Sequence, residues 1–560
     1  MQRTYAVRTL LDAKVPMRDG VRLSADLYLP DGIGPFPTVL IRTPYNNAQD
    51  ELIRKARALA NLGYACVLQD CRGRFDSEGD FYPFVNEAQD GYDTQEWIGQ
   101  QPWCNGKIGT MGASYVGWVQ IASAPLRSRY LTCIAPDVIT AAPFAGMTYP
   151  GGAPQLSVLM MWSTATAGRT AQSIDYTHWR EVFRTLPLLE VDTAAGCDLP
   201  YVRDWLQHPT YDEYWSRINV QDRLGEVEVP SVHVGGWFDL FSASTFASFN
   251  ALRQHGRTPA ARQPKLIVGP WPHAISASTK TGDVDFGAAS MLDLNVEGLR
   301  WLDYWLKGID TGIAAQAPLR LFIMGLNAWR DEQKWPLART DWQRWYFHSR
   351  GHANTLLGDG VLSPTAPAEE LADSFVYHPL YPVPTTAGGT CCWPHVVPWG
   401  PYDQRDVEMR TDVLCYTSAP LEQDLEVTGP IKVVLYAASD CRDTDWTAKL
   451  IDVWPSGYAM SLCDGIQRAS YRESLSEPSP IQPGEVYRYE IDLAVTGNVF
   501  LKGHQIRVEI SSSNFPHYAR NLNTGEPVAT GREIRVAHQT VLHTRAYPSH
   551  IVLPVIPASE

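Results

Sequence analysis

A serine enclosed by small residues, Ser114, is the feature of this sequence that most restricts the fold. It follows the apolar run Ile108–Met111 and precedes a segment of helical character, within Gly109-Thr-Met-Gly-Ala-Ser-Tyr-Val-Gly117. A serine becomes a useful nucleophile when a tight turn between a strand and a helix lifts its hydroxyl above the sheet, which requires small neighbours. The sequence predicts such a turn, although its second glycine comes one residue later than in the common G-x-S-x-G pattern.

The N-terminal third alternates short apolar runs with glycine-marked turns, a pattern typical of βαβ units on a mostly parallel sheet. We expect strands at Arg22–Leu29, Thr38–Arg42, Tyr64–Gln69, Ile108–Met111 and Leu131–Ala135, and helices at Glu51–Asn61, Glu87–Gln100 and Ser114–Ala124. Asp19-Gly20 lies between two alternating runs and predicts a hairpin. The sheet should therefore begin antiparallel and continue parallel.

Two changes of pattern divide the chain. From about Thr140 to Leu224 the sequence is rich in Trp, Tyr and Met and predicts amphipathic helices. Short apolar runs that end in glycine return at Val229–Trp237 and Lys265–Gly269, and Leu292–Lys307 reads as a closing helix. We expect one domain formed by residues 1–139 and 226–317, with residues 140–225 inserted as a helical cap.

Beyond Pro318 helical periodicity nearly disappears. Segments that alternate or run apolar lie between clusters of Pro, Gly, Asp and Ser, at Leu319–Met324, Trp345–His348, Ile431–Tyr436, Ala448–Trp454, Tyr487–Leu493 and Gln505–Ile510. This spacing predicts an antiparallel β-sandwich, specifically a jelly roll, over residues 318–560.

A nucleophilic Ser114 would need an imidazole as base and a carboxylate to orient it. In α/β-hydrolases these follow the serine in the order acid, then histidine, at the ends of later strands. Asp239 and His273 each end such a predicted strand, in that order. The sequence therefore predicts the α/β class, with an α/β-hydrolase fold, an inserted helical cap and a C-terminal jelly roll.

Each of these residues has an ordinary structural role open to it. Asp239 could cap the helix that follows, and His273 could be a loop histidine. His208 and His233 are weaker candidates for the base, because the first lies within the predicted cap and the second within a strand.

Acyl transfer also requires hydrogen-bond donors for the oxyanion. The backbone N–H of Tyr115, the residue after the candidate nucleophile, is one expected donor. Tyr45 follows an early strand in Ile41–Asn46 and offers a phenolic donor, although a packing aromatic is the alternative interpretation.

Five motifs together resemble the CocE/NonD hydrolase family: Arg42-Thr-Pro-Tyr45, Gln69–Gly79, Gly112-Ala-Ser-Tyr-Val-Gly117, Gly235-Gly-Trp-Phe-Asp239 and Gly269-Pro-Trp-Pro-His273. The family comprises cocaine-esterase-like enzymes, α-amino-acid ester hydrolases, glutaryl acylases and the related X-Pro dipeptidyl-peptidases. The resemblance covers the whole chain and implies Ser114 as nucleophile, Asp239 as acid and His273 as base. It also implies an oxyanion hole formed by the Tyr45 hydroxyl and the Tyr115 amide.

The resemblance narrows the range of expected substrates. α-Amino-acid ester hydrolases hold the substrate ammonium with carboxylates, two of which follow the catalytic acid, whereas this chain has Leu240-Phe241-Ser242 there. We therefore expect an uncharged, bulky or aromatic acyl group, with pocket walls from Trp162, Phe238, Phe241 and Trp271.

Three alternatives remain open at this stage. An X-Pro dipeptidyl-peptidase would need a site for the free amino terminus of its substrate. A biosynthetic acyltransferase would use the same triad with an alcohol or amine in place of water. A carbohydrate- or partner-binding protein would instead carry its function on the jelly roll.

The composition restricts partners and location. A net charge of −14 without any basic run argues against nucleic acid, and no segment approaches a membrane span or a secretory signal. The spacing of the ten cysteines matches no zinc site, and Cys391 and Cys392 are vicinal. We expect reduced thiols in a cytoplasmic protein, with the oxidised alternative left open. We expect a small-molecule ester or amide substrate without a metal or organic cofactor, and a homodimer is left open.

Overall fold

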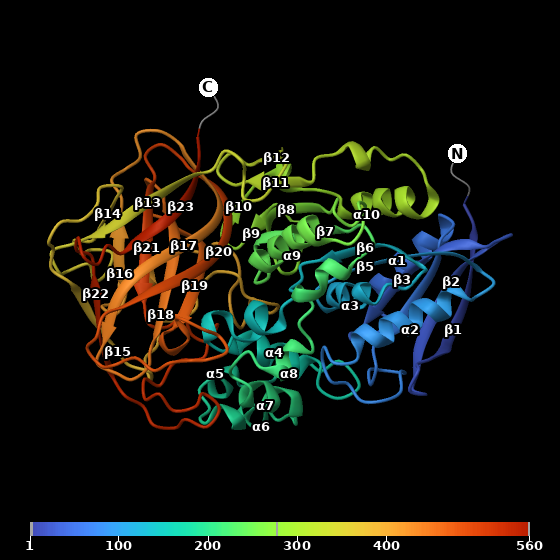
Figure 1. The fold of residues 1–560 in the computed structure, drawn as a ribbon, viewed down its shortest axis with the longest axis horizontal. Coiled ribbons are helices and arrows are strands. Elements are labelled where there is room, and N and C mark those ends of the chain that lie inside the picture. Colours follow the sequence, from blue (N-terminus) through green and yellow to red (C-terminus); the bar gives the residue numbers. More distant parts are fainter. Residues whose placement is uncertain (1–3, 276–277, 558–560) are drawn as a thin grey trace.

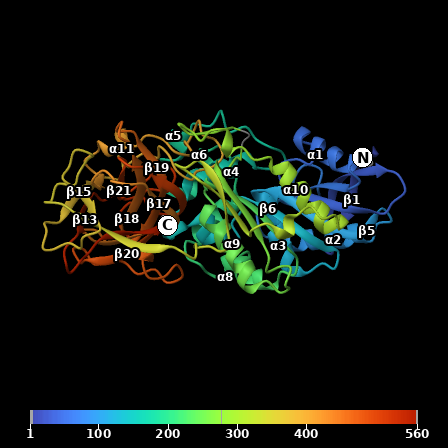
Figure 2. The ribbon, with the colours of Figure 1, turned by 90° about the horizontal axis from the view of Figure 1, so that it is seen from above.

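The computed structural model describes residues 4–275 and 278–557, so the predicted outer limits at residues 1 and 560 lie outside the described ranges. Figure 1 shows a mixed α/β half that carries the N-terminal end and a β-rich half that carries the C-terminal end. Short helices lie between the two halves along one side. Figure 2, from above, shows the same end-to-end arrangement.

The N-terminal half is built on mixed sheets. One has the strand order β1-β2-β4-β3-β5-β6, and a second has the order β12-β11-β8-β7. A parallel bridge between Ile134 and Ser231 brings β6 beside β7, which joins the two sheets. The strands are β1 Ala6–Pro16, β2 Arg22–Asp31, β3 Phe36–Thr43, β4 Ala65–Asp70, β5 Cys104–Ala113, β6 Leu131–Asp137, β7 Val232–Phe238, β8 Lys265–Pro272, β11 Leu319–Ile323 and β12 Ala328–Glu332.

The predicted change of strand direction is confirmed. β1 and β2 pair antiparallel across the Asp19-Gly20 turn, where Gly20 has φ +88°. β2 also pairs antiparallel with β4, whereas β3, β4, β5 and β6 are mutually parallel. The carboxyl ends of the parallel strands consequently meet at one edge, the usual position for a site in such sheets.

Helices cover both faces of this sheet. α1 (Asp50–Asn61) and α10 (Leu294–Leu302) pack on one face, and α2 (Glu87–Gly99) packs on the other. α3 (Tyr115–Ser123) follows β5 directly, and α9 (Ser242–His255) follows β7. The predicted closing helix, Leu292–Lys307, is present as α10 continued by a π-helical turn over Asp303–Lys307.

The region between β6 and β7 is helical, as predicted. Its α-helices are short: α4 Leu156–Ala165, α5 Trp179–Val182, α6 Val191–Ala194, α7 Pro200–Gln207 and α8 Glu213–Ser216. They share one apolar cluster with α3, in which Trp205 and Trp215 are fully buried. This block therefore rests on the part of the sheet that carries Ser114.

The C-terminal half is almost entirely β-structure. Its elements are β13 Asp341–His348, β14 Val361–Ser363, β15 Asp373–Tyr377, α11 Arg405–Glu408, β16 Leu414–Thr417, β17 Leu425–Ser439, β18 Asp445–Val453, β19 Ala459–Arg468, β20 Tyr487–Phe500, β21 Gln505–Ser511, β22 Ala537–Leu542 and β23 His550–Ile556. The described pairings are antiparallel except β14 with β16. Buried side chains such as Phe375, Leu435 and Trp446 form its core.

One predicted strand of the sandwich belongs elsewhere. β11 (Leu319–Ile323) pairs parallel with β8 on one side and antiparallel with β12 (Ala328–Glu332) on the other. These strands extend the mixed sheet because their apolar side chains pack against β8 as well as the sandwich core. The assignment of Leu319–Met324 to the sandwich was therefore wrong.

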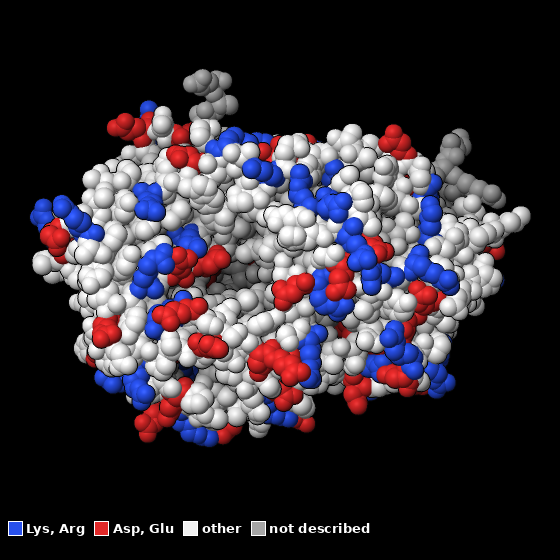
Figure 3. Space-filling view, viewed as in Figure 1, with Lys and Arg blue, Asp and Glu red and all other residues white. Residues whose placement is uncertain are grey.

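Within the described ranges, no helix is both long and apolar enough to cross a bilayer. On the face shown in Figure 3, acidic and basic side chains are interspersed, so the excess negative charge is not gathered there into one patch. A hollow lies near the middle of this face.

Candidate active site

Ser114 occupies a strained turn between β5 and α3. Its backbone has φ +60° and ψ −129°, a conformation that non-glycine residues rarely adopt. A Cβ on Gly112 would lie 2.2 Å from Val116 Cγ1, and one on Gly117 would lie 2.5 Å from Ile139 Cγ2. Both glycines are therefore required by close packing. The late glycine serves the contact between α3 and the segment after β6.

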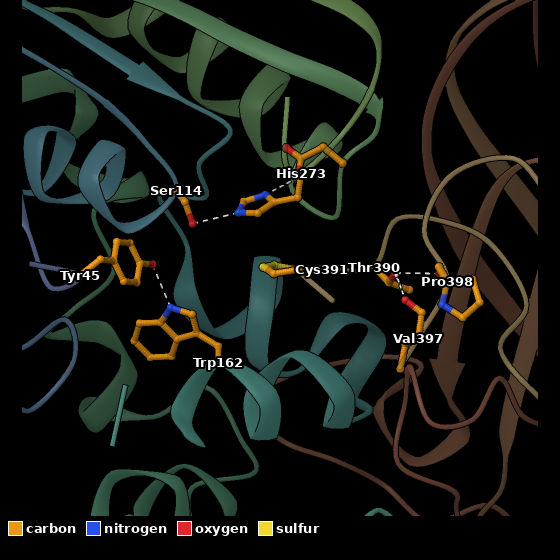
Figure 4. Close-up of a disulfide and its surroundings, with 10 residues drawn as sticks. Tyr45, Ser114, Trp162, His273, Thr390, Cys391, Val397 and Pro398 are labelled. Atoms are coloured by element: carbon orange, nitrogen blue, oxygen red, sulfur yellow. Dashed lines mark hydrogen bonds and ion pairs between the residues drawn. A yellow bond between two sulfur atoms is a disulfide. The ribbon is translucent and has the colours of Figure 1, made fainter. Parts of the chain in front are cut away.

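His273 and Asp239 meet Ser114 at the sheet edge. His273 follows β8, and its Nε2 lies 2.9 Å from Ser114 Oγ. Asp239 follows the neighbouring β7, and its Oδ1 lies 2.8 Å from His273 Nδ1. Asp239 and His273 are 2% and 7% exposed, so water competes little for these bonds. Figure 4 shows His273 pointing at Ser114.

Tyr45 and Tyr115 are the two residues for which the sequence predicts oxyanion donors. Tyr45 follows β3, and its phenolic oxygen accepts a 2.9 Å hydrogen bond from Trp162 Nε1 (Figure 4). Desolvation raises the pKa of Tyr45, so the phenol keeps its proton at neutral pH. Tyr115 begins α3, and the helix ladder does not use the N–H groups of its first turn.

A buried network fixes the Tyr115 side chain. Its hydroxyl donates to Glu87 Oε1 at 3.1 Å and accepts from the Phe84 N–H at 2.9 Å. Arg42 Nη2 donates to Glu87 Oε2 at 2.8 Å. Burial raises the pKa of Glu87, against the opposing effect of the Arg42 charge. The turn at Ser114 is thus anchored to β3 and α2.

Arg74, within the Gln69–Gly79 motif, has a structural role through backbone carbonyls. Its fully buried guanidinium donates from Nε to the Pro44 carbonyl at 2.7 Å and from Nη1 to the Thr166 carbonyl at 2.6 Å. It also donates to the Gly168 carbonyl. Pro44 precedes Tyr45, and Thr166 follows α4, so this single side chain ties the Tyr45 loop to the helical block.

An apolar cavity opens at Ser114. Its described lining residues are Phe84, Ser114, Tyr115, Trp118, Ile139, Thr140, Met147, Val158, Leu159, Trp162, Leu240, Phe241, His273 and Cys391. Trp162 and Phe241 both line this cavity. Apart from His273, none of the described lining residues is acidic or basic.

The structure corrects the expected positions of Phe238 and Trp271. Phe238 is buried in the core shared with the sandwich and contacts Phe286. Trp271 packs with Val234 and Trp329 on the opposite side of its strand. A register shift between β7 and β8 at Gly236 and Phe238 changes which side chains point toward the site.

The expectation of ten reduced cysteines is wrong for one pair. Cys391 and Cys392 form a vicinal disulfide, whereas the other eight cysteines are free. Cys391 reaches the cavity from the loop between β15 and α11, far from the triad candidates along the chain. No local motif indicated this approach.

The competing histidines have other partners. His208 Nδ1 lies 2.6 Å from Asp212 Oδ2 within the helical block. His233 is buried beside Ser231, and burial lowers its pKa to about 4. Neither residue is among those that line the cavity at Ser114.

Both halves of the chain match models of known protein families. Residues 19–275 match the X-Pro dipeptidyl-peptidase (S15 family) model, and residues 311–552 match the X-Pro dipeptidyl-peptidase C-terminal non-catalytic domain. Cocaine esterase from Rhodococcus sp. (strain MB1 Bresler) is 38% identical and aligns over 97% of each chain.

Two solved structures share the whole architecture. An aminopeptidase from the marine sediment archaeon Thaumarchaeota archaeon has a TM-score of 0.85 and 26% identity, covering 99% of this chain and 97% of its own. An α-amino acid ester hydrolase has a TM-score of 0.84 and 25% identity, with the same coverage. Cocaine esterase, the α-amino acid ester hydrolase and the S15 family match together show that this chain is a serine hydrolase of carboxylic esters. The chain belongs to the CocE/NonD family.

Proposed function

We propose that this enzyme cleaves carboxylic esters through Ser114, His273 and Asp239, with an uncharged bulky or aromatic acyl group. The observation that supports this most directly is the hydrogen-bonded series from Asp239 through His273 to Ser114, with distances of 2.8 and 2.9 Å. The series ends at the mouth of an apolar cavity. These are the components required for acyl transfer by a serine.

In the proposed mechanism, His273 Nε2 accepts the proton of Ser114 as Oγ attacks the ester carbonyl. Asp239 holds Nδ1–H and stabilises the imidazolium that forms. The Tyr45 hydroxyl and the Tyr115 N–H donate to the oxyanion, and the leaving alcohol takes its proton from His273. Water, activated by the same imidazole, then hydrolyses the acyl-enzyme.

The lining of the cavity supports the acyl preference. A substrate ammonium placed there would lose hydration without meeting a carboxylate among the described lining residues. Phe241, Trp162 and Met147 instead offer apolar and aromatic contacts.

The domain division forms part of the proposal. We assign residues 1–139 and 226–317, together with β11 and β12, to an α/β-hydrolase domain, with residues 140–225 as its cap. We assign the remaining C-terminal strands to a jelly roll. The strand order β1-β2-β4-β3-β5-β6 and the helical block over Ser114 support the first two assignments.

Substitution of the nucleophile tests the mechanism. Ser114→Ala should abolish hydrolysis of p-nitrophenyl esters, with an unchanged circular dichroism spectrum and melting temperature. A fluorophosphonate should label the unmodified enzyme at Ser114 and leave the variant unlabelled. Full activity in the variant would contradict the assignment of the nucleophile.

A substrate panel tests the acyl preference. Esters with aromatic or branched alkyl acyl groups should exceed aminoacyl esters in kcat/KM, because an aminoacyl ammonium would meet no counter-charge among the described lining residues of the cavity. The match to the S15 family model favours one second candidate function, X-Pro dipeptidyl-peptidase activity. Release of p-nitroaniline from Ala-Pro-p-nitroanilide at a rate above ester hydrolysis would establish that alternative.

A further inference from the structure

The vicinal cysteines stand beside the reacting groups without a role in the proposed mechanism. Cys391 is 3% exposed and lines the same cavity as Ser114 and His273. Figure 4 shows it between the Ser114–His273 pair and the Tyr45–Trp162 pair. Its sulfur therefore faces the space in which a substrate would react.

The loop that carries the pair is pinned at its base. Gly388 and Gly400 exchange backbone hydrogen bonds of 3.0 and 2.9 Å. The Thr390 hydroxyl donates to the Pro398 carbonyl at 2.8 Å. These contacts hold Cys391 at the site, although it comes from the C-terminal half of the chain.

The three side chains are close enough to share one ion. A sulfur from each of Cys391 and Cys392 and a ring nitrogen of His273 all lie within 4.8 Å of one another. Within the described ranges, these three form the group of His, Cys, Asp and Glu side chains that meets this criterion. A tetrahedral zinc ion binds cysteine sulfur at ~2.3 Å and histidine nitrogen at ~2.0 Å, so small side-chain rotations would bring all three into contact with it.

The proposed triad already orients the histidine for a metal. His273 Nδ1 is occupied by Asp239, which leaves Nε2, 2.9 Å from Ser114 Oγ, as the nitrogen that can offer a lone pair to a metal in place of the serine proton. A carboxylate behind a ligating histidine is the usual supporting arrangement in zinc sites. Water or Ser114 Oγ would complete four ligands.

We propose that reduction of the Cys391–Cys392 disulfide opens a site for a thiophilic divalent cation such as Zn²⁺, held by both thiolates and His273, and that its occupation blocks hydrolysis. This inference rests on the proposed function for its inhibitory part. In the oxidised pair neither sulfur is available as a thiolate, so the disulfide is a neutral part of the cavity wall.

Reduction of the disulfide and binding of zinc conserve electrons and protons. A dithiol reductant transfers two electrons and two protons to the protein disulfide, whose S–S bond breaks to give two thiols while the reductant closes to its own disulfide. Zn²⁺ then binds the two sulfurs with release of both thiol protons. The His273 Nε2 lone pair passes to the metal and can no longer accept the proton of Ser114.

Metal binding is measured first on a variant that lacks the proposed nucleophile and therefore cannot hydrolyse substrate. Full-length Ser114→Ala enzyme is reduced with excess dithiol, freed of it anaerobically, and titrated with Zn²⁺ against a chromophoric chelator. We expect one equivalent of Zn²⁺ per chain when reduced and at least tenfold weaker binding when oxidised. Adding Cys391→Ser, Cys392→Ser or His273→Ala should weaken binding of the reduced chain at least tenfold.

Cys197→Ser is the matched control. Cys197 is a half-buried free cysteine that does not line this cavity, so its substitution should leave the zinc affinity unchanged. If the cysteine variants fail to fold, the comparison of oxidised with reduced Ser114→Ala chain still decides. Equal zinc binding in the two redox states would overturn the proposal.

Inhibition is measured on the active enzyme. Zn²⁺ should inhibit the reduced enzyme, a chelator should restore its rate, and the oxidised enzyme should be insensitive at the same concentration. The rate of each reduced cysteine variant is measured with and without zinc. The fraction of activity that zinc removes should be at least tenfold smaller than in the reduced unmodified enzyme. Equal inhibition of reduced and oxidised enzyme would refute the switch. An enzyme without esterase activity would refute the proposed function, while the titration would still decide the metal site.

Discussion

The indole N–H of Trp162 donates a 2.9 Å hydrogen bond to the phenolic oxygen of Tyr45. Trp162 belongs to α4 in the helical block, and Tyr45 belongs to the loop after β3. Because the phenolic oxygen accepts this bond, its own proton remains free to be donated elsewhere. The helical block thus helps to aim the proposed oxyanion donor as well as to enclose the acyl group.

Trp162→Phe tests this positioning role. The change keeps an aromatic wall but removes the donor to Tyr45, so we expect kcat to fall about five- to tenfold, equivalent to ~1 kcal/mol. Trp118→Phe is the matched control, because Trp118 lines the same cavity and its indole N–H has no partner among the described residues. Steady-state kinetics on an aryl ester should show a much smaller change in kcat for the control. Equal losses in the two variants would contradict the role.

Tyr45→Phe tests the oxyanion donor itself. Loss of one such donor typically lowers kcat by roughly 10²- to 10³-fold, and we expect this with little change in KM. Tyr115→Phe provides the contrast, because it removes the phenol bonded to Glu87 but keeps the backbone N–H. Its kcat should fall less than tenfold, while its melting temperature decreases. A rise in KM alone for Tyr45→Phe would assign Tyr45 to substrate binding.

Gly117→Ala tests the late glycine of the turn. The added methyl would lie 2.5 Å from Ile139 Cγ2 and 2.9 Å from the Asp137 carbonyl oxygen. We expect a loss of unfolding free energy of roughly 1–3 kcal/mol together with reduced activity. In α10, a Cβ on Gly298 would meet only Met111 Cε, at 3.7 Å. Gly298→Ala should therefore be neutral or stabilising by up to about 1 kcal/mol in urea unfolding.

Asp70→Asn tests a buried carboxyl at the end of β4. Burial raises the pKa of Asp70 to about 7, although its Oδ1 accepts a 2.8 Å bond from the Asn47 N–H. Between about pH 4 and pH 7 the folded chain therefore holds a proton that the unfolded chain has lost, and stability falls as pH rises through this window.

The asparagine variant does not titrate and can still accept the Asn47 bond. Its stability relative to the unmodified enzyme should increase from pH 4 to pH 7 and level off above, by roughly 1–3 kcal/mol in urea unfolding at pH 8. A constant difference between the proteins at pH 4 and pH 8 would show that the carboxyl is already ionised at the lower pH.

Local sequence patterns predicted the strands of the mixed sheet and the candidate site residues that directly follow them. The alternation of apolar runs and glycines predicted β3 to β8 to within a few residues, and therefore the edge where Ser114, Asp239 and His273 meet. Those residues could be found because each directly follows its strand. Parallel strands deliver such positions to one place whatever the intervening sequence.

Features set by long-range packing could not be predicted in this way. Phe238 and Trp271 adjoin the proposed triad in sequence, but an irregular register turns them into other clusters. Cys391 reaches the cavity from a loop whose own sequence has no turn or motif that indicates the site. The partners of Arg74 are backbone carbonyls, which carry no sequence pattern at all.

The carbonyl contacts of Arg74 also restrict how molecules can enter and leave. A hinge movement of the helical block away from the sheet would take the Thr166 and Gly168 carbonyls away from this buried guanidinium, leaving it the Pro44 carbonyl. It would also separate Trp162 from Tyr45. Such opening is unfavourable because a buried charge would lose hydrogen bonds. If the helical block stays closed, substrate and product pass through an entrance of nearly constant size, and we expect that entrance to limit the length of the ester.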